Sequence, residues 1–360
     1  MTSSLDIARE SYRLIALYAP NRAPARVDLS DNTNLWGVPP AAARAIAGAA
    51  AGAAVTRYPN LYAAELKREL AAYLGVAADM VVTGCGSDDV LDSAVRAFGE
   101  PGDRVAVPDP SFAMIPIFAR MNALEPVRVP LTGDFDADAD AMLATGAKLI
   151  YLCSPNNPTG AALRPETIER VVREAPGVVI VDEAYQEFSD RPSATRLLAA
   201  SERLLVCRTM SKAFGIAGLR VGYAAGAPSL VAEVEKSRGP YKVNALAERA
   251  ALAALREDMP WVRARVAEAV ENRDRLAERL RALGLAPVPS QANFVLVPFR
   301  GACDVARRMR DAGIAVRPFD DLGDRLPAFR AANGEGLRIS VGPWEVLEAM
   351  LAALADALGG

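Results

Sequence analysis

Short apolar runs alternate along the chain, from about residue 80 onward, with stretches whose apolar residues recur at helical spacing. Six of these runs predict strands, namely Met80–Thr83, Arg104–Val107, Leu149–Cys153, Val178–Val181, Leu204–Cys207 and Val221–Ala224. The segments Asp88–Phe98 and Pro165–Glu174 are typical of helices between such strands. This alternation predicts an α/β fold with a mostly parallel sheet covered by helices on both faces. Ligands of such sheets bind beyond the carboxyl ends of the strands.

The pattern changes after Pro240. A long helical stretch, Ala245–Leu283, is interrupted at Pro260. It is followed by a predicted strand Ala292–Val297, helix Cys303–Ala312, strands Ile314–Arg317 and Gly336–Val341, and helix Pro343–Leu358. Longer helices and fewer strands predict a smaller α+β domain. We therefore expect an N-terminal arm (1–30) that packs with the small domain, a large domain (31–240) and a small domain (241–360).

Composition and charge exclude several classes of function. The 360 residues are enough for about two domains, and 41 Lys and Arg against 44 Asp and Glu leave no basic field for bulk nucleic-acid binding. The absence of histidine excludes a Ser-His-Asp triad, a Cys-His pair and any His-ligated metal. Four scattered cysteines without a C-x-x-C pair predict reduced thiols in a cytoplasmic protein. We expect neither a signal peptide nor a membrane span, because no apolar stretch has the required length.

The segment Thr83–Asp89 (T-G-C-G-S-D-D) joins a predicted strand to a predicted helix. Its glycines would let the backbone approach a ligand closely, and the helix start would offer free N–H groups to an anion. A plain helix cap by Ser87 or Asp88 explains the same pattern equally well. A dinucleotide-binding G-x-G-x-x-G motif is excluded, because Asp89 stands where the third glycine would be.

Further polar residues follow other predicted strands. The segment 153–160 is either a plain Asn-Pro turn or part of a site. Asp182 ends a predicted buried strand, where an ionised carboxylate needs a cationic or proton-bearing partner, and Tyr185 follows it. Lys212 lies among small and apolar neighbours, where desolvation favours the nucleophilic amine, although a solvated surface lysine is the alternative. Arg220 could bind a phosphate or pair with a surface acid.

Five motifs together resemble one known family. They are S-P-N-N-P-T-G at 154–160, V-D-E-A-Y at 181–185, S-K-A-F-G-I-A-G-L-R-V-G at 211–222, A-N-F-V-L at 292–296 and L-R-I-S-V-G at 337–342. In this order they resemble the fold-type-I pyridoxal-phosphate enzymes, specifically class I/II aminotransferases, and within these the histidinol-phosphate aminotransferase family. The resemblance implies a mostly parallel sheet between helices in a large domain and a smaller α+β C-terminal domain. It also implies an enzyme of amino-acid biosynthesis.

The resemblance assigns roles toward pyridoxal 5'-phosphate. Lys212 would bind the cofactor covalently and then move a proton between substrate and cofactor. Asp182 would pair with the pyridine nitrogen and keep it protonated, so that the ring can accept electrons. Asn157 and Tyr185 would hydrogen-bond the ring oxygen. Phe112 would stack on the ring, at a position where the family often has tyrosine.

The resemblance also implies a phosphate site and a homodimer. The phosphate would be held by Ser87, Asp88, Ser211 and Arg220. Tyr58 would reach the phosphate from the neighbouring subunit. Each active site would then be composite and the homodimer obligatory.

The expected donor is anionic, because Arg338 and Arg317 would hold a phosphate or carboxylate. Tyr18 would close over the pocket and Asn34 would border it. We expect histidinol phosphate as first donor, 2-oxoglutarate as acceptor and a ping-pong cycle (EC 2.6.1.9). The segment 31–37 (D-N-T-N-L-W-G) lacks the glutamate of the family's N-E-N-P-like pattern, which leaves the donor open.

Three alternatives stay open on the sequence. The first is an aminotransferase for aromatic or other α-amino acids. The second is a decarboxylase of the threonine-phosphate type, which shares the framework. The third is a non-catalytic pyridoxal-phosphate-binding regulator. The presence of Lys212 and the lack of an additional basic N-terminal domain argue against a regulator.

Overall fold

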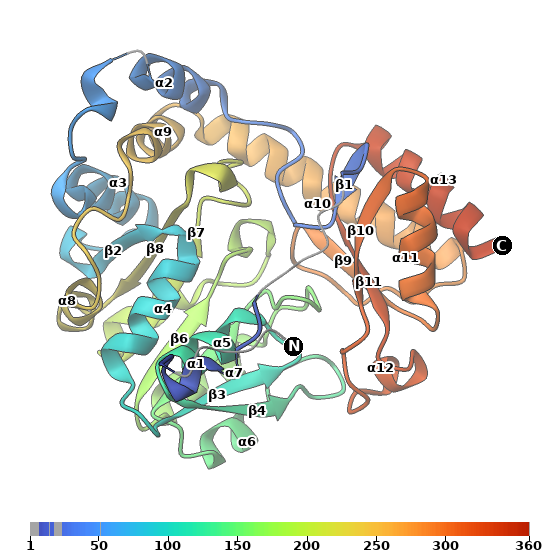
Figure 1. Cartoon of the computed structure of the whole chain (residues 1–360), viewed down its shortest axis with the longest axis horizontal. Helices are drawn as coiled ribbons and strands as arrows, with labels where there is room; N and C mark the ends of the chain where they lie inside the picture. The colour runs from blue at the N-terminus through green and yellow to red at the C-terminus, as the bar shows by residue number, and fades with distance from the viewer. Residues whose placement is uncertain (1–6, 14, 18–23, 51, 360) are drawn as a thin grey trace.

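The computed structural model describes residues 7–13, 15–17, 24–50 and 52–359. Its large domain is built on a seven-stranded sheet in the order β2-β8-β7-β6-β5-β3-β4 (Figure 1). The strands are β2 (Val81–Cys85), β3 (Arg104–Asp109), β4 (Glu125–Pro130), β5 (Leu149–Cys153), β6 (Val178–Asp182), β7 (Leu204–Thr209) and β8 (Val221–Gly226). β8 pairs antiparallel with β2 and β7, and the other pairs are parallel. The prediction of an α/β fold with a mostly parallel sheet is confirmed.

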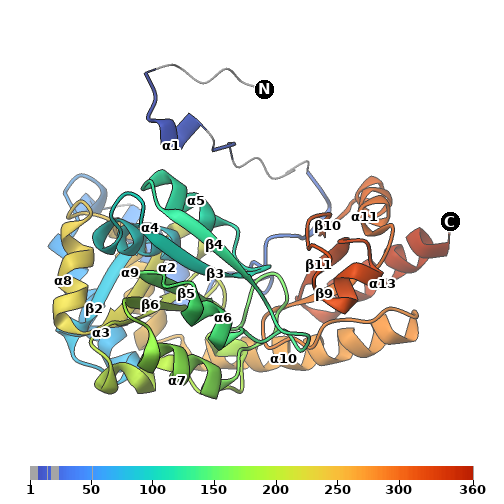
Figure 2. The same cartoon turned by 90° about the horizontal axis from the view of Figure 1, so that it is seen from below.

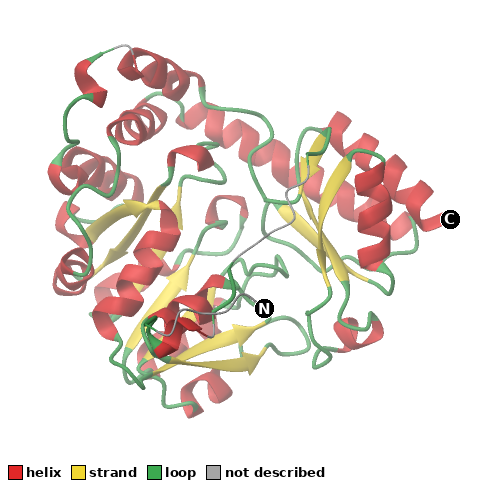
Figure 3. Cartoon of the chain, in the orientation of Figure 1, coloured by secondary structure: helices red, strands yellow, loops and turns green. Residues whose placement is uncertain are grey.

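Helices cover both faces of this sheet (Figure 3). They are α3 (Ala64–Leu74), α4 (Gly86–Phe98), α5 (Met114–Met121), α6 (Ala139–Ala144), α7 (Pro165–Glu174) and α8 (Pro228–Lys236). Alternate residues of β5 face different apolar clusters: Tyr151 packs with residues of α4, α5 and α8, and Leu152 packs with residues of α6 and α7. A strand buried on both faces needs apolar residues at every position, which explains why these strands are readable as continuous apolar runs.

The small domain contains a four-stranded sheet in the order β1-β10-β11-β9. Its strands are β1 (Val27–Leu29), β9 (Phe294–Pro298), β10 (Ile314–Phe319) and β11 (Gly336–Ser340). Its helices are α11 (Ala302–Asp311), α12 (Pro327–Ala331) and α13 (Trp344–Gly359). β1 pairs parallel with β10, so a segment from near the N-terminus completes the edge of this sheet.

The two ends of the expected arm lie on different domains. β1 belongs to the small-domain sheet, whereas α1 (Glu10–Arg13) contacts α5 of the large domain (Figure 2). Short 3₁₀ helices occur at Ala53–Val55, Leu61–Ala63, Ala78–Met80, Gln186–Phe188, Ala194–Ala200 and Ala217–Leu219. No helix in the described part of the chain is long and apolar enough to cross a membrane.

The predicted long helix is two helices, α9 (Ala245–Arg256) and α10 (Met259–Ala282). Pro260 lies in the first turn of α10, where its missing N–H breaks no helical hydrogen bond. α9 packs against α2 (Pro40–Ala50) and α3, so elements beyond residue 240 are continuous with the large domain. α10 then runs from the large to the small domain along the lower edge of Figure 2, and the domain boundary at residue 240 stays a prediction.

Candidate active site

Polar side chains gather beyond the carboxyl ends of the parallel strands, beside the small domain. Asp182 is the last residue of β6, Asn157 follows β5, and Lys212 follows β7. The small domain contributes Arg338 from β11, whose guanidinium Nη1 donates to Asn157 Oδ1 at 2.6 Å. Residues that are far apart in the sequence therefore meet where an α/β sheet binds its ligands.

The Asp182 carboxylate is buried, with 3% of the residue exposed. The Tyr151 hydroxyl donates to its Oδ2 at 2.8 Å, and the Ala184 backbone N–H donates to its Oδ1 at 3.1 Å. Burial outweighs these two bonds and raises the pKa of Asp182 to about 6. A buried carboxyl with a raised pKa is suited to a cationic or proton-bearing partner. Sequence analysis missed Tyr151, because a tyrosine in an apolar strand is indistinguishable there from a core residue.

The Lys212 amine lies between the large domain and the segment that follows β1. Its Nζ donates to the Asp31 carbonyl oxygen at 3.1 Å and lies 5.9 Å from the centre of the Tyr185 ring. Burial, followed by the charge of Arg338, lowers the Lys212 pKa to about 8. A substantial fraction of this amine is therefore neutral, and nucleophilic, near pH 8.

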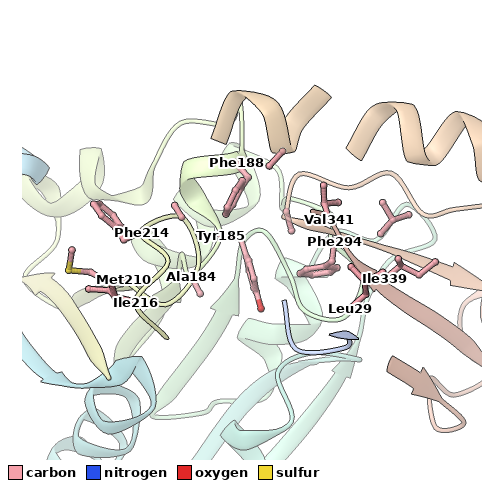
Figure 4. Packing of buried hydrophobic residues seen from close by; sticks show 14 of the residues in the cluster. Leu29, Ala184, Tyr185, Phe188, Met210, Phe214, Ile216, Phe294, Ile339 and Val341 are labelled. Atoms are coloured by element: carbon pink, nitrogen blue, oxygen red, sulfur yellow. The ribbon is translucent and has the colours of Figure 1, made fainter. Parts of the chain in front are cut away.

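Tyr185 packs by its ring into an apolar cluster that spans both domains. Figure 4 shows the ring near Phe294, with the hydroxyl oxygen directed away from Phe188. The Tyr185 and Phe294 rings meet edge-on with centres 5.1 Å apart. The Tyr185 hydroxyl oxygen accepts from Asn32 Nδ2 at 3.2 Å, and burial raises the Tyr185 pKa to about 12. The phenol is therefore protonated at neutral pH. Asn32 was also missed by sequence analysis, which singled out Asn34 in the same segment.

Two arginines lie side by side on the small-domain sheet. Arg317 and Arg338 are directly opposite each other in the β10–β11 ladder, which places them on one face. Arg338 is 8% exposed, and its guanidinium also donates from Nη2 to the Ser30 carbonyl oxygen at 2.7 Å. Arg317 is half-buried and makes no ion pair or hydrogen bond with any residue that the structure describes. The pair is a concentration of positive charge beside Asn157.

A cradle of glycines and cations lies at the start of α4. A Cβ atom built on Gly86 would lie 2.2 Å from Arg220 Nη2, and one built on Gly222 would lie 2.1 Å from the Gly86 carbonyl carbon. Only glycine allows this close approach. Arg220 Nη1 donates to Ser211 Oγ at 3.5 Å, and Arg220 Nη2 pairs with Asp88 Oδ2 at 3.4 Å.

The cradle fits a phosphate. Ser87 lies in the first turn of α4, whose unpaired N–H groups favour an anion, and Arg220 and Ser211 add donors. Burial raises the pKa of Asp88, which reduces the negative charge that this carboxyl would present to the anion. Together with the Lys212 amine and the Asp182 carboxyl, this donor set matches the aldehyde, ring nitrogen and phosphate of pyridoxal phosphate.

The loop that carries Phe112 is fixed to the turn that carries Asn157. Ser111 Oγ donates to Asn156 Oδ1 at 2.7 Å, and Asn156 Nδ2 donates to the Pro110 carbonyl oxygen at 3.0 Å. Phe112 itself is half-buried against the apolar cluster on the α4 face of the sheet. Its assignment as the residue that stacks on the cofactor ring stays a prediction.

Two of the expected residues lie apart from the gathered side chains, and a third lies outside the described residues. Tyr58 is 83% exposed and stacks on Tyr241, with ring centres 4.9 Å apart. The Asn34 side chain binds two backbone groups: its Nδ2 donates to the Ala213 carbonyl oxygen at 3.1 Å, and its Oδ1 accepts from the Trp36 N–H at 2.9 Å. Asn34 thus supports the loop that carries Lys212. Tyr18 lies outside the described residues.

Comparison with known proteins gives consistent matches over nearly the whole chain. Residues 25–354 match the family model of the class I and II aminotransferases. The chain is similar to an aromatic amino acid aminotransferase of Corynebacterium glutamicum (38% identity over 350 residues, 95% of this chain and 99% of that one). It is also similar to a histidinol-phosphate aminotransferase of Thermobifida fusca (39% over 364 residues, 98% and 95%).

A solved structure is similar over both domains. It is the histidinol-phosphate aminotransferase of Sinorhizobium meliloti in complex with pyridoxal-5'-phosphate. The TM-score is 0.87 at 26% identity, with 100% of this chain and 99% of that chain covered. The similarity therefore includes the large domain, the small domain and the site between them.

Proposed function

Because the chain belongs to the class I and II aminotransferases and is therefore a pyridoxal-phosphate-dependent enzyme of fold type I, we propose that it transfers an amino group from an anionic donor to 2-oxoglutarate. The reaction would proceed in two half-reactions, of which the first releases the keto product. The Arg317–Arg338 pair carries the proposal of an anionic donor. Histidinol phosphate is the donor that we put first.

Lys212 and Asp182 are the proposed catalytic residues. When bound, pyridoxal phosphate supplies a ring that accepts electrons as the donor's α-carbon loses its proton. Lys212 would hold the cofactor covalently and then take up and return this proton at Nζ, which its pKa of about 8 permits near neutral pH. Asp182 would face the ring nitrogen and keep its proton in place. Tyr151 holds the carboxylate for this task through its hydrogen bond to Oδ2.

The remaining proposed contacts orient the cofactor. Ser87, Ser211 and Arg220 would bind its phosphate, with Asp88 holding the Arg220 guanidinium. Asn157 would hydrogen-bond the ring oxygen together with Tyr185. Asn157 is itself fixed by Arg338, so the cofactor site and the donor site share this one hydrogen bond.

Two donor classes fit the arginine pair. A phosphate needs more positive charge than a carboxylate, and Arg317, which pairs with no described acid, supplies it. An aromatic amino acid is the second candidate, because the rings of Phe294 and Phe319 flank the Arg338 guanidinium at 5.3 and 5.7 Å. The segment 31–37 also favours considering this second donor, because Thr33 stands where the family pattern has glutamate.

A competition assay decides between these donors. The purified enzyme is given histidinol phosphate and phenylalanine together with 2-oxoglutarate, and each keto product is measured along with glutamate. Preference for histidinol phosphate supports the first proposal, and preference for phenylalanine replaces it with the second. Release of carbon dioxide without glutamate would contradict aminotransfer altogether. Arg317→Ala is the matched variant: it should weaken turnover of the phosphate donor more than that of phenylalanine.

We further propose that the enzyme is a homodimer with composite sites. Exposed apolar side chains occur near Tyr58 in the sequence, namely Val55, Leu61 and Tyr62, and the exposed Tyr241 stacks on its ring. The Tyr62 N–H donates to the Pro240 carbonyl oxygen at 3.2 Å, and Asn60 Nδ2 donates to the buried Glu248 carboxylate at 3.1 Å, so the residues that follow Tyr58 are tied to the rest of the chain. An apolar surface of this kind favours cover by a partner. A second copy would place Tyr58 at the partner's phosphate cradle.

We also propose a cytoplasmic location. The four cysteines, Cys85, Cys153, Cys207 and Cys303, are all free thiols in the structure. Free thiols persist in reducing compartments.

A further inference from the structure

Asn32 occupies a buried left-handed position between the two domains. It lies three residues beyond β1, is 1% exposed, and has a φ of 54°. Asparagine is one of the few residues other than glycine that adopt this conformation readily. Its side chain is therefore directed into the site by a backbone conformation that most residues would resist.

Each polar group of Asn32 has a partner. Its backbone N–H donates to Ser340 Oγ at 2.8 Å, and its Oδ1 accepts from the same hydroxyl at 3.2 Å. Its carbonyl oxygen accepts from Asn293 Nδ2 at 3.1 Å. The remaining group, the side-chain NH₂, donates to the Tyr185 hydroxyl oxygen at 3.2 Å. Asn32 thus connects two residues of the small domain to one phenol of the large domain.

The direction of the bond to Tyr185 follows from these partners. Reversing the amide would aim a second donor, the NH₂ group, at the Ser340 oxygen and would take from the Ser340 hydroxyl proton its acceptor, Asn32 Oδ1. With the orientation found, the NH₂ group can only donate, so the phenol oxygen must accept. The phenol proton then has to be donated elsewhere, and it has no acceptor among the described residues.

We infer that Asn32 is a positioning residue that directs the Tyr185 hydroxyl proton to the ring oxygen of the cofactor. This inference rests on the proposed function, which places that oxygen beside Tyr185. By occupying the accepting side of the phenol oxygen, Asn32 leaves Tyr185 able to act only as a donor in the site. The Asn32 backbone and Oδ1, which are fixed by Ser340, hold the amide in this orientation.

Asn32→Asp is the test, because it changes the hydrogen-bond direction with little change of shape. The carboxylate keeps an acceptor for Ser340 and tolerates the left-handed backbone, but it offers no donor to Tyr185. The phenol then donates to the new carboxylate and no longer donates to the cofactor. A donor to the ring oxygen stabilises its negative charge and lowers the basicity of the neighbouring nitrogen that Lys212 supplies. Its loss should raise the pKa of that nitrogen, which is measured from the change of the bound cofactor's visible absorption band with pH. We call this value the band's pKa.

We expect a shift of the band's pKa that corresponds to about tenfold in the acid dissociation constant. The cofactor dissociation constant should rise by a similar factor. The control is Tyr185→Phe, which should shift the band in the same direction by itself. Adding Asn32→Asp to Tyr185→Phe should then produce a clearly smaller shift than in the parent, because the phenol through which Asn32 acts is gone and only the effect of the new negative charge remains. A merely structural role of Asn32 would move the band equally in both backgrounds.

The outcomes separate the inference from the function on which it rests. A band that Tyr185→Phe shifts and Asn32→Asp leaves unchanged overturns the role of Asn32 alone. A band that Tyr185→Phe does not shift overturns the proposed role of Tyr185. If Asn32→Asp does not fold, Asn32→Gly replaces it, since glycine accepts the positive φ and removes the NH₂ donor. Asn32→Gly should give a smaller shift in the same direction, and the absence of any shift counts against the inference.

Discussion

Burial makes the charged forms of two ionisable side chains at the candidate site less favourable than they are in water. Burial raises the pKa of Asp182 to about 6 and lowers the pKa of Lys212 to about 8. Each shift means that the charged form is less favourable in the folded protein than in the unfolded chain. Without the cofactor, both side chains therefore reduce the free energy of unfolding at neutral pH. A bound cofactor that pairs with the two charges would offset this reduction.

Lys212→Met should make the cofactor-free protein more stable at pH 7 while abolishing turnover and the visible band. The unfolded pKa of this lysine is 10.5 and the folded pKa about 8, so the penalty is fully present below pH 8. It fades as the pH rises from 8 to 10.5. Thermal unfolding of the cofactor-free parent and variant at pH 7 and pH 10.5 measures this, and the two melting temperatures should converge at the higher pH. Normal turnover in the variant would contradict the assignment.

Asp182→Asn should slow turnover by a factor on the order of 10² or more, because an amide cannot stabilise a protonated ring nitrogen. The carboxyl's pKa is raised from 3.8 to about 6, so its penalty on stability is absent below pH 3.8 and complete above pH 6. The difference in melting temperature between variant and parent should therefore grow in favour of the variant from pH 4 to pH 7. Turnover within threefold of the parent would exclude the proposed role.

From the sequence we could predict site residues whose chemistry is unusual at their position. Residues that hold another site residue by a hydrogen bond were missed. Asp182 ends one apolar strand and Lys212 follows another, where a charge needs an explanation, and both belong to the candidate site. Tyr151 and Asn32 are ordinary in their segments. Their importance depends on hydrogen bonds to residues 31 and 153 positions away, which no local pattern indicates.

At the scale of elements, the register of β10 and β11 decides whether the two arginines share one face of the small-domain sheet. The ladder sets Arg317 opposite Arg338, and a slip by one residue would turn one of the two side chains to the other face. The guanidinium of Arg338 already spans two partners, Asn157 Oδ1 and the Ser30 carbonyl oxygen. The planar fork, not only the charge, is needed for this arrangement.

Arg338→Lys should lower kcat/KM for the true donor. The loss should correspond to an increase of about 2–3 kcal/mol in activation free energy, because an ammonium group keeps the charge but loses the two-pronged geometry. The loss should be larger than that for Arg317→Lys, since Arg317 holds no described protein group that must be replaced. Steady-state kinetics with the donor found in the competition assay give both values. Equal, small losses for the two variants would show that Arg338 is not the anchor.

Element prediction succeeded where burial is complete and failed at edges. β5 and α7 have the predicted bounds, because both faces of β5 are buried and α7 begins at a proline. β4 was not predicted, since Pro126 and Pro130 are unfavourable inside a sheet. They are tolerated because β4 is the edge strand and pairs only with β3. β1 is a three-residue strand that exists through its pairing with β10, which lies nearly 290 residues later.

At the scale of the whole molecule, the proposed homodimer requires each subunit to contribute to two sites. Tyr58 lies on an exposed loop, and in the proposed dimer it does not serve the same site as the Lys212 of its own chain. A site that uses Lys212 from one subunit and Tyr58 from the other can be rebuilt from two different inactive variants.

Mixed Lys212→Ala and Tyr58→Glu subunits should recover activity, with an upper limit of about a quarter of the parent's after random exchange. Tyr58→Glu is chosen because a carboxylate would repel the cofactor phosphate. In the hybrid dimer one of the two sites has both native residues. Mixing Lys212→Ala with Asp182→Asn is the control and should recover nothing, as each of its sites keeps one defect. No recovery after verified exchange would place Tyr58 outside the partner's site.

The two sheets divide the enzyme's tasks in a way that bears on how its specificity can change over evolution. The proposed cofactor chemistry depends on strands of the seven-stranded sheet, whereas the arginine pair belongs to the four-stranded sheet. Substitutions on β10, which carries Arg317, would therefore change the preference among donors while Asp182 and Lys212 stay in place. The same architecture can thus serve donors as different as a phosphate ester and an aromatic amino acid, and a newly acquired preference need not be preceded by loss of the reaction itself.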